Sequence, residues 1–256
     1  MPKGTTALAA GKTFDLDMKG DGLVEVKVTE AALNTQIENH GAITADSGRV
    51  VLSAKSANAL MDTIINQNGI IKAQDLVKRN GEIILDGGDN GTVKISGTLD
   101  TARVGWAEER SPSTTTNANN GLSTSAHPTT TVRPEPFDYA HENPVEGRDG
   151  NITIKGNTIE LSNTAMVNAS SNTQCGNIQI GDKQTTQTVT LKQDSMVQAN
   201  AENSDAGHIH VLAKMDTGKV DVQGKLHAKA TSKGNGGFID TSAHQVNISD
   251  IATINT

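Results

Sequence analysis

Short runs in which apolar and polar residues alternate recur along this chain, separated by Gly, Asn, Asp or Ser. In the second half such runs begin at residues 150, 176, 207 and 236, in steps of 26, 31 and 29; they read GNITIKG, GNIQIGD, GHIHVLA and GGFIDTS. Strict alternation predicts strands that bury one face. A unit that returns about every 28 residues is typical of a solenoid.

The first half contains a related repeat, with a short insertion near residues 77–79 of its second copy. Each copy has runs of apolar residues that begin with a Gly, and we expect each run to form a short strand. These runs are GAITA at 41–45, GRVVL at 48–52, GIIKA at 69–73, GEIIL at 81–85 and GTVKI at 91–95.

The first part of each copy, before its first Gly, favours a single turn or two of helix. Leu33 and Ile37 lie four residues apart, as do Leu60 and Ile64, which places each pair on one helical face. Thr29 is suited to cap the first of these turns, because its hydroxyl can accept from a backbone N–H that the helix leaves unpaired.

Three short strands per repeat predict one coil of a three-sided parallel β-helix, an all-β solenoid in which each coil pairs with the coils on either side. Roughly eight coils at about 4.8 Å each would make it about 35 to 40 Å long. Small and β-branched residues would stack inside, while Gly and Asn would turn the corners. We expect such coils over residues 1–110 and again over 150–256, as one continued solenoid.

Residues 111–149 interrupt this pattern. The run is rich in Ser, Thr and Asn, contains five of the six Pro residues and has almost no apolar periodicity. We expect one loop that leaves the coil, mobile or lightly packed along one face. The alternative is a binding loop, for which Phe137 and Tyr139 are the aromatic candidates.

Composition narrows the classes of function. Aromatic residues make up only 2% of the chain, so the interior must be built from aliphatic side chains. A net charge of −7 offers no basic surface for a phosphate backbone, which argues against nucleic acid as a partner. No apolar run reaches the 18 residues of a membrane-spanning helix. Cys175 is the single cysteine, so an internal disulfide is excluded and a buried, inert thiol is expected.

Two groups of residues could hold a metal ion. His208 and His210 are two apart on an expected strand and would share one face, with His227 as a possible third ligand. Solvent-facing histidines are the alternative, and we favour it because zinc needs three or four convergent ligands. Aspartates near DGGDNGT resemble calcium-binding turns, but the nonapeptide G-G-x-G-x-D is absent, so ordinary turn residues are favoured. They are Asp86, Asp89 and Asp100.

Enzymes that act on pectin also use β-helices, so a carbohydrate-active enzyme is the alternative from another class. It would need clustered carboxylates on one face, and exposed aromatic residues for sugar, whereas Trp106 is the single Trp. The chain also lacks a P-loop, a G-x-S-x-G elbow and a CxxC motif. We therefore expect no enzyme activity, no cofactor, and no catalytic or metal-binding residue.

Four sequences match the N-x-[ST] glycosylation pattern, which chance alone produces in a chain rich in Asn and Thr. Their asparagines are Asn90, Asn151, Asn168 and Asn247.

Taken together, several sequence segments of this chain resemble the large exoproteins of the filamentous haemagglutinin type, which Gram-negative bacteria export by two-partner secretion. The resemblance is carried by GDGLVEVKVTEAALN, ENHGAITADSGRVVLSAKSANALMDTIINQNGIIKAQ, NGEIILDGG, NGTVKISGTLDTA and GNGGFIDTSAHQVNI. It covers nearly the whole chain outside 111–149 and is most specific over residues 20–102. It implies a right-handed parallel β-helix, threaded unfolded through an outer-membrane transporter and folded outside the cell.

The chain departs from that family in two respects. The family's N-terminal secretion domain follows a signal peptide and carries Asn-Pro-Asn motifs, and neither is found; Asn143 and Pro144 form the one Asn-Pro pair, without a following Asn. We therefore expect the end of that domain, or the coils just after it, with the start of the shaft.

The resemblance implies a structural and adhesive segment of a secreted or cell-surface protein. Its partners would be the outer-membrane transporter during export and a host-cell surface protein or glycan afterwards. Unpaired strand edges at the ends of the solenoid would favour self-association. The alternative within the family is a passive stem of a haem-acquisition or contact-dependent toxin-delivery protein.

Overall fold

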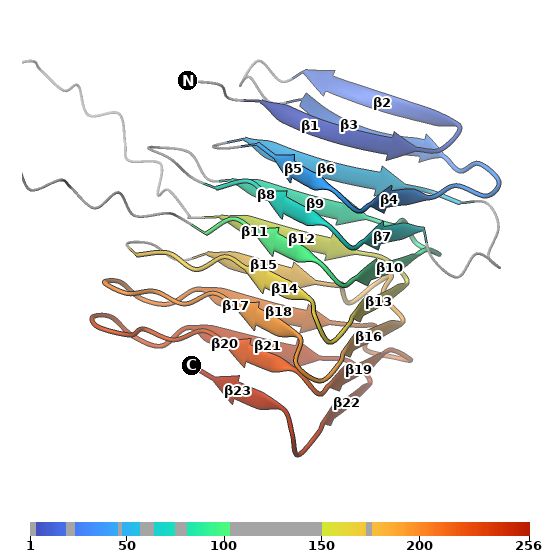
Figure 1. Cartoon of the computed structure of the whole chain (residues 1–256). Coiled ribbons are helices and arrows are strands. Elements are labelled where there is room, and N and C mark those ends of the chain that lie inside the picture. Colours follow the sequence, from blue (N-terminus) through green and yellow to red (C-terminus); the bar gives the residue numbers. More distant parts are fainter. Residues whose placement is uncertain are drawn as a thin grey trace, which may run out of the picture. The chain divides into compact units, whose positions relative to one another are not determined.

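The computed structural model describes residues 4–18, 24–45, 48–56, 64–74, 81–102, 150–172 and 176–256. Apart from one hairpin, their strands form three sheets of seven strands each (Figure 1). The first sheet contains β1 (Thr5–Ala10), β6 (Arg49–Ala54), β9 (Glu82–Asp86), β12 (Asn151–Lys155), β15 (Asn177–Ile180), β18 (His208–Leu212) and β21 (Phe238–Ser242).

The second and third sheets follow the same order. The second contains β4 (Ile37–Asn39), β7 (Ile65–Gln67), β10 (Thr92–Ile95), β13 (Thr158–Leu161), β16 (Thr188–Leu191), β19 (Lys219–Val222) and β22 (Gln245–Ile248). The third contains β5 (Ala42–Thr44), β8 (Ile70–Lys72), β11 (Thr98–Asp100), β14 (Met166–Asn168), β17 (Met196–Gln198), β20 (Lys225–His227) and β23 (Thr253–Asn255).

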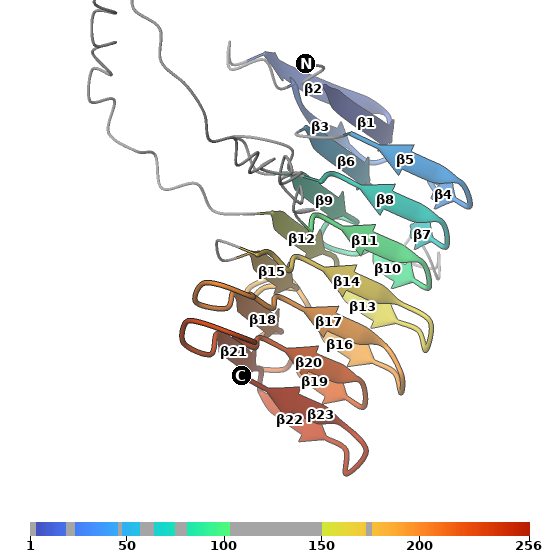
Figure 2. The same ribbon diagram turned by 60° about the vertical axis from the view of Figure 1, so that its left-hand side comes forward.

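The chain visits the first, second and third sheet in turn, so that three consecutive strands make one coil (Figure 2). Every strand of these sheets pairs in parallel with its counterpart one coil away; Ile152, for example, lies opposite Ile178, which lies opposite Ile209. The predicted three-sided parallel β-helix is confirmed. Its sheets have seven strands each, one fewer than the roughly eight coils expected.

Identical or similar aliphatic residues stack in columns through the interior. Inward positions of the first sheet hold Ile152, Ile178 and Ile209, all almost fully buried. Small residues such as Ala199 and Ala228 fill the corners, also without exposure. Burying a Val, Leu or Ile side chain contributes about 1.5–3 kcal/mol to stability. Because the chain has very few aromatic residues, these aliphatic columns are its main source of hydrophobic stabilisation.

One corner between the second and third sheets is built from glycine and buried amides. A Cβ atom on Gly69 would collide with the carbonyl oxygen of Gly41, one coil away, so the coils approach too closely there for any side chain. Asn39 and Gln67 stack inside this corner, where the Asn39 Nδ2 donates to the Gln67 Oε1 at 2.8 Å. The Gln67 Nε2 in turn donates to the carbonyl oxygen of Gly69 at 2.9 Å. The pairing removes the cost of burying two amides.

The helical turns expected before each coil are wrong for the described residues, which contain no helix. Thr29 belongs to β3 (Val24–Glu30), and Leu33 lies exposed in a turn. Ile37 begins β4 and pairs with Ile65 of the next coil. In so short a run, two apolar residues four positions apart fit one face of a helix and also fit the ends of two strands, so the spacing does not distinguish the two structures. Leu60 lies outside the described residues.

An antiparallel hairpin between β1 and β4 was not expected from the sequence. It consists of β2 (Thr13–Met18) and β3, and β3 packs against the outer face of β1 and β6. There Val28 is buried and its backbone N–H donates to the Ser53 hydroxyl. The hairpin therefore covers the outer face of the first sheet at one end only.

All three sheets continue across the segment that separates the two halves of the chain. β9 pairs with β12, β10 with β13 and β11 with β14. The expected loop at 111–149, with its aromatic residues, lies outside the described residues, as do Trp106, Cys175 and the pair Asn143 and Pro144. In the part of the chain that is described, no helix is long and apolar enough to cross a membrane.

The stacked columns predict a strong difference between two identical substitutions. Ile178→Ala should lower the free energy of unfolding by about 2–5 kcal/mol, because it leaves a cavity between two coils. Ile251→Ala, at an exposed corner, should lower it by about 0.5 kcal/mol. Urea unfolding followed by far-UV circular dichroism measures both. Equal effects would show that the columns do not carry the stability.

Candidate functional site

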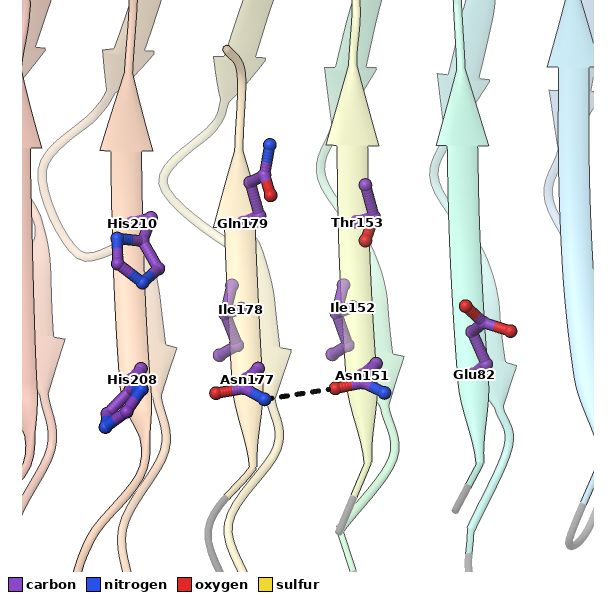
Figure 3. A pocket seen from close by; sticks show the side chains of 9 residues that line it. All are labelled: Glu82, Asn151, Ile152, Thr153, Asn177, Ile178, Gln179, His208 and His210. Atoms are coloured by element: carbon purple, nitrogen blue, oxygen red, sulfur yellow. Dashed lines mark hydrogen bonds between the residues drawn. The ribbon is translucent and has the colours of Figure 1, made fainter. Parts of the chain in front are cut away.

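The outer face of the first sheet is hollowed where the hairpin no longer covers it. From β9 to β18 an open groove of about 380 Å³ runs across four strands, and we call it the outer groove. Figure 3 shows its lining residues, which are Glu82, Asn151, Ile152, Thr153, Asn177, Ile178, Gln179, His208 and His210.

The register of the coils arranges these side chains in two rows. Glu82, Asn151, Asn177 and His208 occupy one outward position on successive strands. Along this row the Asn177 Nδ2 donates to the Asn151 Oδ1 at 3.4 Å (Figure 3). Because strands repeat about every 4.8 Å, a ligand that crosses them meets a polar group at each step.

A second row lies two residues further along each strand. Thr153, Gln179 and His210 occupy it on β12, β15 and β18. The Gln179 Nε2 donates to the carbonyl oxygen of Gly181 at 3.1 Å, so the amide oxygen of Gln179 can still accept a hydrogen bond from a ligand. Hydroxyl, amide and imidazole groups both donate and accept, so the two rows can form hydrogen bonds with a polar ligand of either kind.

Charged and aromatic groups lie at the two ends of the groove. At one end Glu82 forms an ion pair with Arg49, at 2.5 Å between the Glu82 Oε2 and the Arg49 Nε. At the other end the Phe238 ring lies 6.2 Å from the His208 ring and 5.7 Å from the His210 ring, between centroids. Asp240 lies beside them, with its Oδ2 at 3.7 Å from the His210 Nδ1.

His208 and His210 lie on one outward face, as their spacing predicted. The suggested third ligand, His227, lies on β20 in the third sheet, so the structure does not bring it to the pair. Among the described residues, no group of three or more His, Cys, Asp or Glu side chains is arranged to hold a metal ion.

Two of the aspartates near DGGDNGT accept hydrogen bonds. The Asp86 Oδ1 accepts from the backbone N–H of Gly88 at 2.9 Å. Asp100 accepts from the Gln74 Nε2 at 2.8 Å and from the Asn168 Nδ2 at 3.1 Å. Asp89 is exposed in the turn that follows β9. The Asp86 bond lies within a turn, whereas the Asp100 bonds join β11 to neighbouring parts of the solenoid.

The four glycosylation patterns lie in different surroundings. Asn90 is exposed in a turn and Asn247 is exposed on β22. Asn151 lines the outer groove, and Asn168 donates to Asp100. The N-x-[ST] pattern alone did not distinguish the asparagines in exposed positions from those that line the groove or bond to a neighbouring coil.

Sequence reasoning missed the outer groove, although part of its signal was present. Asn151, Asn177 and His208 each follow the Gly that opens a repeat, so their shared position could have been read from the aligned runs. The ring contacts of Phe238 with the two histidines could not, because the orientation of these side chains depends on packing.

Comparison with models of known protein families finds none that matches, and no curated protein matches either. Among solved structures, the crystal structure of the HMW1 secretion domain from Haemophilus influenzae is similar, with a TM-score of 0.62 and 17% sequence identity. The alignment covers 98% of this chain and 55% of that one, so this chain spans about half of its length. At this identity the likeness shows the shared solenoid fold.

The surroundings of His227 predict its titration. Burial lowers the pKa of its imidazole, and the charges of Lys229 and Lys225 lower that pKa further. The buried Nε2 has no hydrogen-bond partner among the described residues, so nothing there favours the protonated ring. Lys225→Gln should raise the pKa of His227, whereas Lys94→Gln, on β10 of the second sheet, should not.

Proton NMR of the imidazole against pH measures both substitutions. The sign extends to stability: below about pH 6.5 the unfolded chain binds a proton that the folded chain resists, so stability falls as the pH drops toward 5. His227→Gln should lose less stability over that range than the unsubstituted chain. An equal loss would contradict the lowered pKa.

Proposed function

We propose that this chain is a segment of a secreted β-helical exoprotein of the filamentous haemagglutinin type, exported through an outer-membrane transporter by two-partner secretion. The observation that carries the proposal is the solenoid fold, shared with a secretion domain over 98% of this chain. The sequence segments that resemble this type of exoprotein agree with the proposal, although no family model matches the chain.

The construction of the solenoid suits export in an unfolded state. Each coil contacts the coils directly before and after it. Except for β1 with β6 and the pairs that flank residues 103–149, paired strands of the three sheets lie about 30 residues apart, as with Asn177 and His208. Such a chain can fold coil by coil as it emerges, and the pairs that flank residues 103–149 are the place where its sheets join the most distant segments. The single cysteine also leaves no internal disulfide to be formed.

Outside the cell, the segment would serve adhesion through the outer face of its first sheet. The outer groove is shallow and exposes hydrogen-bonding groups in two registered rows, all uncharged except Glu82 and the two histidines. Shallow polar contacts are individually weak, and repetition along a face raises the overall strength of attachment. The ligand would be a protein or glycan of a host-cell surface.

Substitutions that fill the outer groove should abolish such attachment. Asn177→Arg with Gln179→Arg places two long side chains in the groove, and we expect binding of the purified chain to host cells to fall at least about tenfold. Thr188→Arg with Thr190→Arg is the matched control, because these residues point outward from β16 in the second sheet.

Flow cytometry with fluorescent chain measures binding, and a glycan panel tests the ligand class. A variant without residues 111–149 forms a third arm. Loss of binding confined to that variant would move adhesion to the segment it lacks, and no binding by any form would leave a passive stem.

Export predicts where the parent protein is found. Antibodies against the chain should label intact cells of the source bacterium, or detect the protein in the culture medium, without permeabilisation. Labelling that requires permeabilised cells would contradict secretion. An antibody against a cytoplasmic protein controls for the integrity of the cells.

A further inference from the structure

Two consecutive strands of the first sheet carry an apolar residue at an outward position that is polar on the later strands. That position is held by Val51 on β6 and by Ile84 on β9. On the next three strands it is held by Thr153, Gln179 and His210. The sequence shows the difference directly, because RVVL and EIIL in the first half stand against NITI, NIQI and HIHV in the second. A strand with one solvated face alternates apolar and polar residues, so the doubled apolar residues indicate strands that are covered on both faces.

The hairpin covers the first of these two strands. Val51 is 4% exposed and Ser53, which also points outward from β6, is 1% exposed, because β3 packs across β1 and β6. β3 directs Val26 and Val28 at this surface, and both are buried as well. Ile84, one strand further along, remains partly exposed. The hairpin therefore ends one strand short of the apolar surface.

The hairpin has a free strand edge at this border. Within the described residues, β3 pairs with β2 and with no other strand. Figures 1 and 2 show β2 on the side away from β6 and β9, so the second edge of β3 is turned toward them. The Val28 N–H points to that side, where it donates to the Ser53 hydroxyl on β6 at 3.5 Å. Backbone groups alternate between the two edges of a strand, so those of Val26 and Val28 lie along the edge away from β2.

A strand added to this edge would lie above the uncovered residue. Paired strands are about 4.8 Å apart, and β3 lies over β1 and β6, so one further strand would lie over β6 and β9. Its backbone would pair with Val26 and Val28, and its inward side chains would cover Ile84 as those of β3 cover Val51. One occupant would thus use both the hydrogen-bonding groups of the edge and the apolar surface beside it.

The occupant must bring an apolar face of its own. The described strands of this chain already have places in the four sheets. The β3 strand of a second copy is unsuitable, since its valines are buried against its own solenoid and its other face carries the exposed Lys27 and Thr29. An extended segment of a different protein, with apolar residues at alternate positions, fits both the edge and the surface.

We propose that the free edge of β3 binds an extended segment of a partner protein, which pairs antiparallel with β3, becomes the third strand of the hairpin and covers Ile84. We call this the β3 edge site. It borders the outer groove at Glu82, which lies on the same strand as Ile84. This inference does not depend on the proposed adhesion.

A synthetic peptide with the sequence of β3, VEVKVTE, has the required alternation and serves as the probe. Fluorescence anisotropy of the labelled peptide, titrated with the purified chain, should show saturable binding. Ile84→Lys should weaken this binding at least about tenfold, because it places a charge beneath the added strand. Ile84→Thr, which copies the residue of the next coil, should weaken it by a smaller factor. Thr190→Lys, which points outward from β16 in the second sheet, is the matched control.

Methylation of the peptide backbone tests the edge pairing itself. In an antiparallel ladder, two facing residues that form a hydrogen-bonded pair exchange both of their backbone hydrogen bonds. The valines of the probe would therefore bond to Val26 and Val28. N-methylation of the inner valines of the probe should abolish binding, whereas N-methylation of its first Glu and its Lys, which direct their N–H groups to the other edge, should leave binding unchanged.

Several results would overturn the proposal. They are the absence of saturable binding to the unsubstituted chain, equal affinity for the chain and for both Ile84 variants, and equal affinity of the two methylated peptides. Dimers of the unsubstituted chain that Ile84→Lys abolishes in sedimentation velocity would assign the edge to a second copy instead. Far-UV circular dichroism verifies that each variant is folded, and Ile84→Thr decides the outcome if Ile84→Lys does not fold.

Discussion

In-register stacking of inward aliphatic side chains, coil upon coil, is the constraint on which the rest of this structure depends. Ile152, Ile178 and Ile209 illustrate it: each side chain is buried, and each lies in register with its counterpart one coil away. Neighbouring coils leave little space between them, so aliphatic and small side chains fit in these columns and large aromatic rings do not. Close approach at the corners follows from the same constraint and explains why Gly69 tolerates no side chain.

Registered columns inside the solenoid enforce registered rows outside it. Because side chains alternate between the two faces, the residues that flank a buried Ile are fixed in position on the outer face. Asn177 and Gln179 face outward for this reason, and the outer groove is a consequence of their alignment with neighbouring strands. The hairpin of β2 and β3 then decides where this surface is exposed, since it covers β6 and leaves β9 to β18 open.

The repeated alternation was sufficient to predict the parallel β-helix and most of its strands, because burial on one face imposes a period of two. It was insufficient where tertiary pairing decides the outcome. Ile37 fits a helix or a strand equally well by spacing, and its pairing with Ile65 selects the strand. Apolar and polar residues also alternate along both strands of the hairpin, but this pattern does not indicate which sheet the hairpin covers. Of the candidate residues, His208 and His210 were placed correctly on one face, while His227 belongs to another sheet.

The proposal that this solenoid is exported and meets other molecules through its outer face rests on the outer groove and on the shared fold. The most direct test of that claim is hydroxyl-radical footprinting of the chain bound to host cells. Phe238, His208 and His210 should lose reactivity on binding, whereas Met215, in an exposed turn away from the outer groove, should keep it. Unchanged reactivity of the Phe238 cluster, with protection elsewhere on the described surface, would contradict the account.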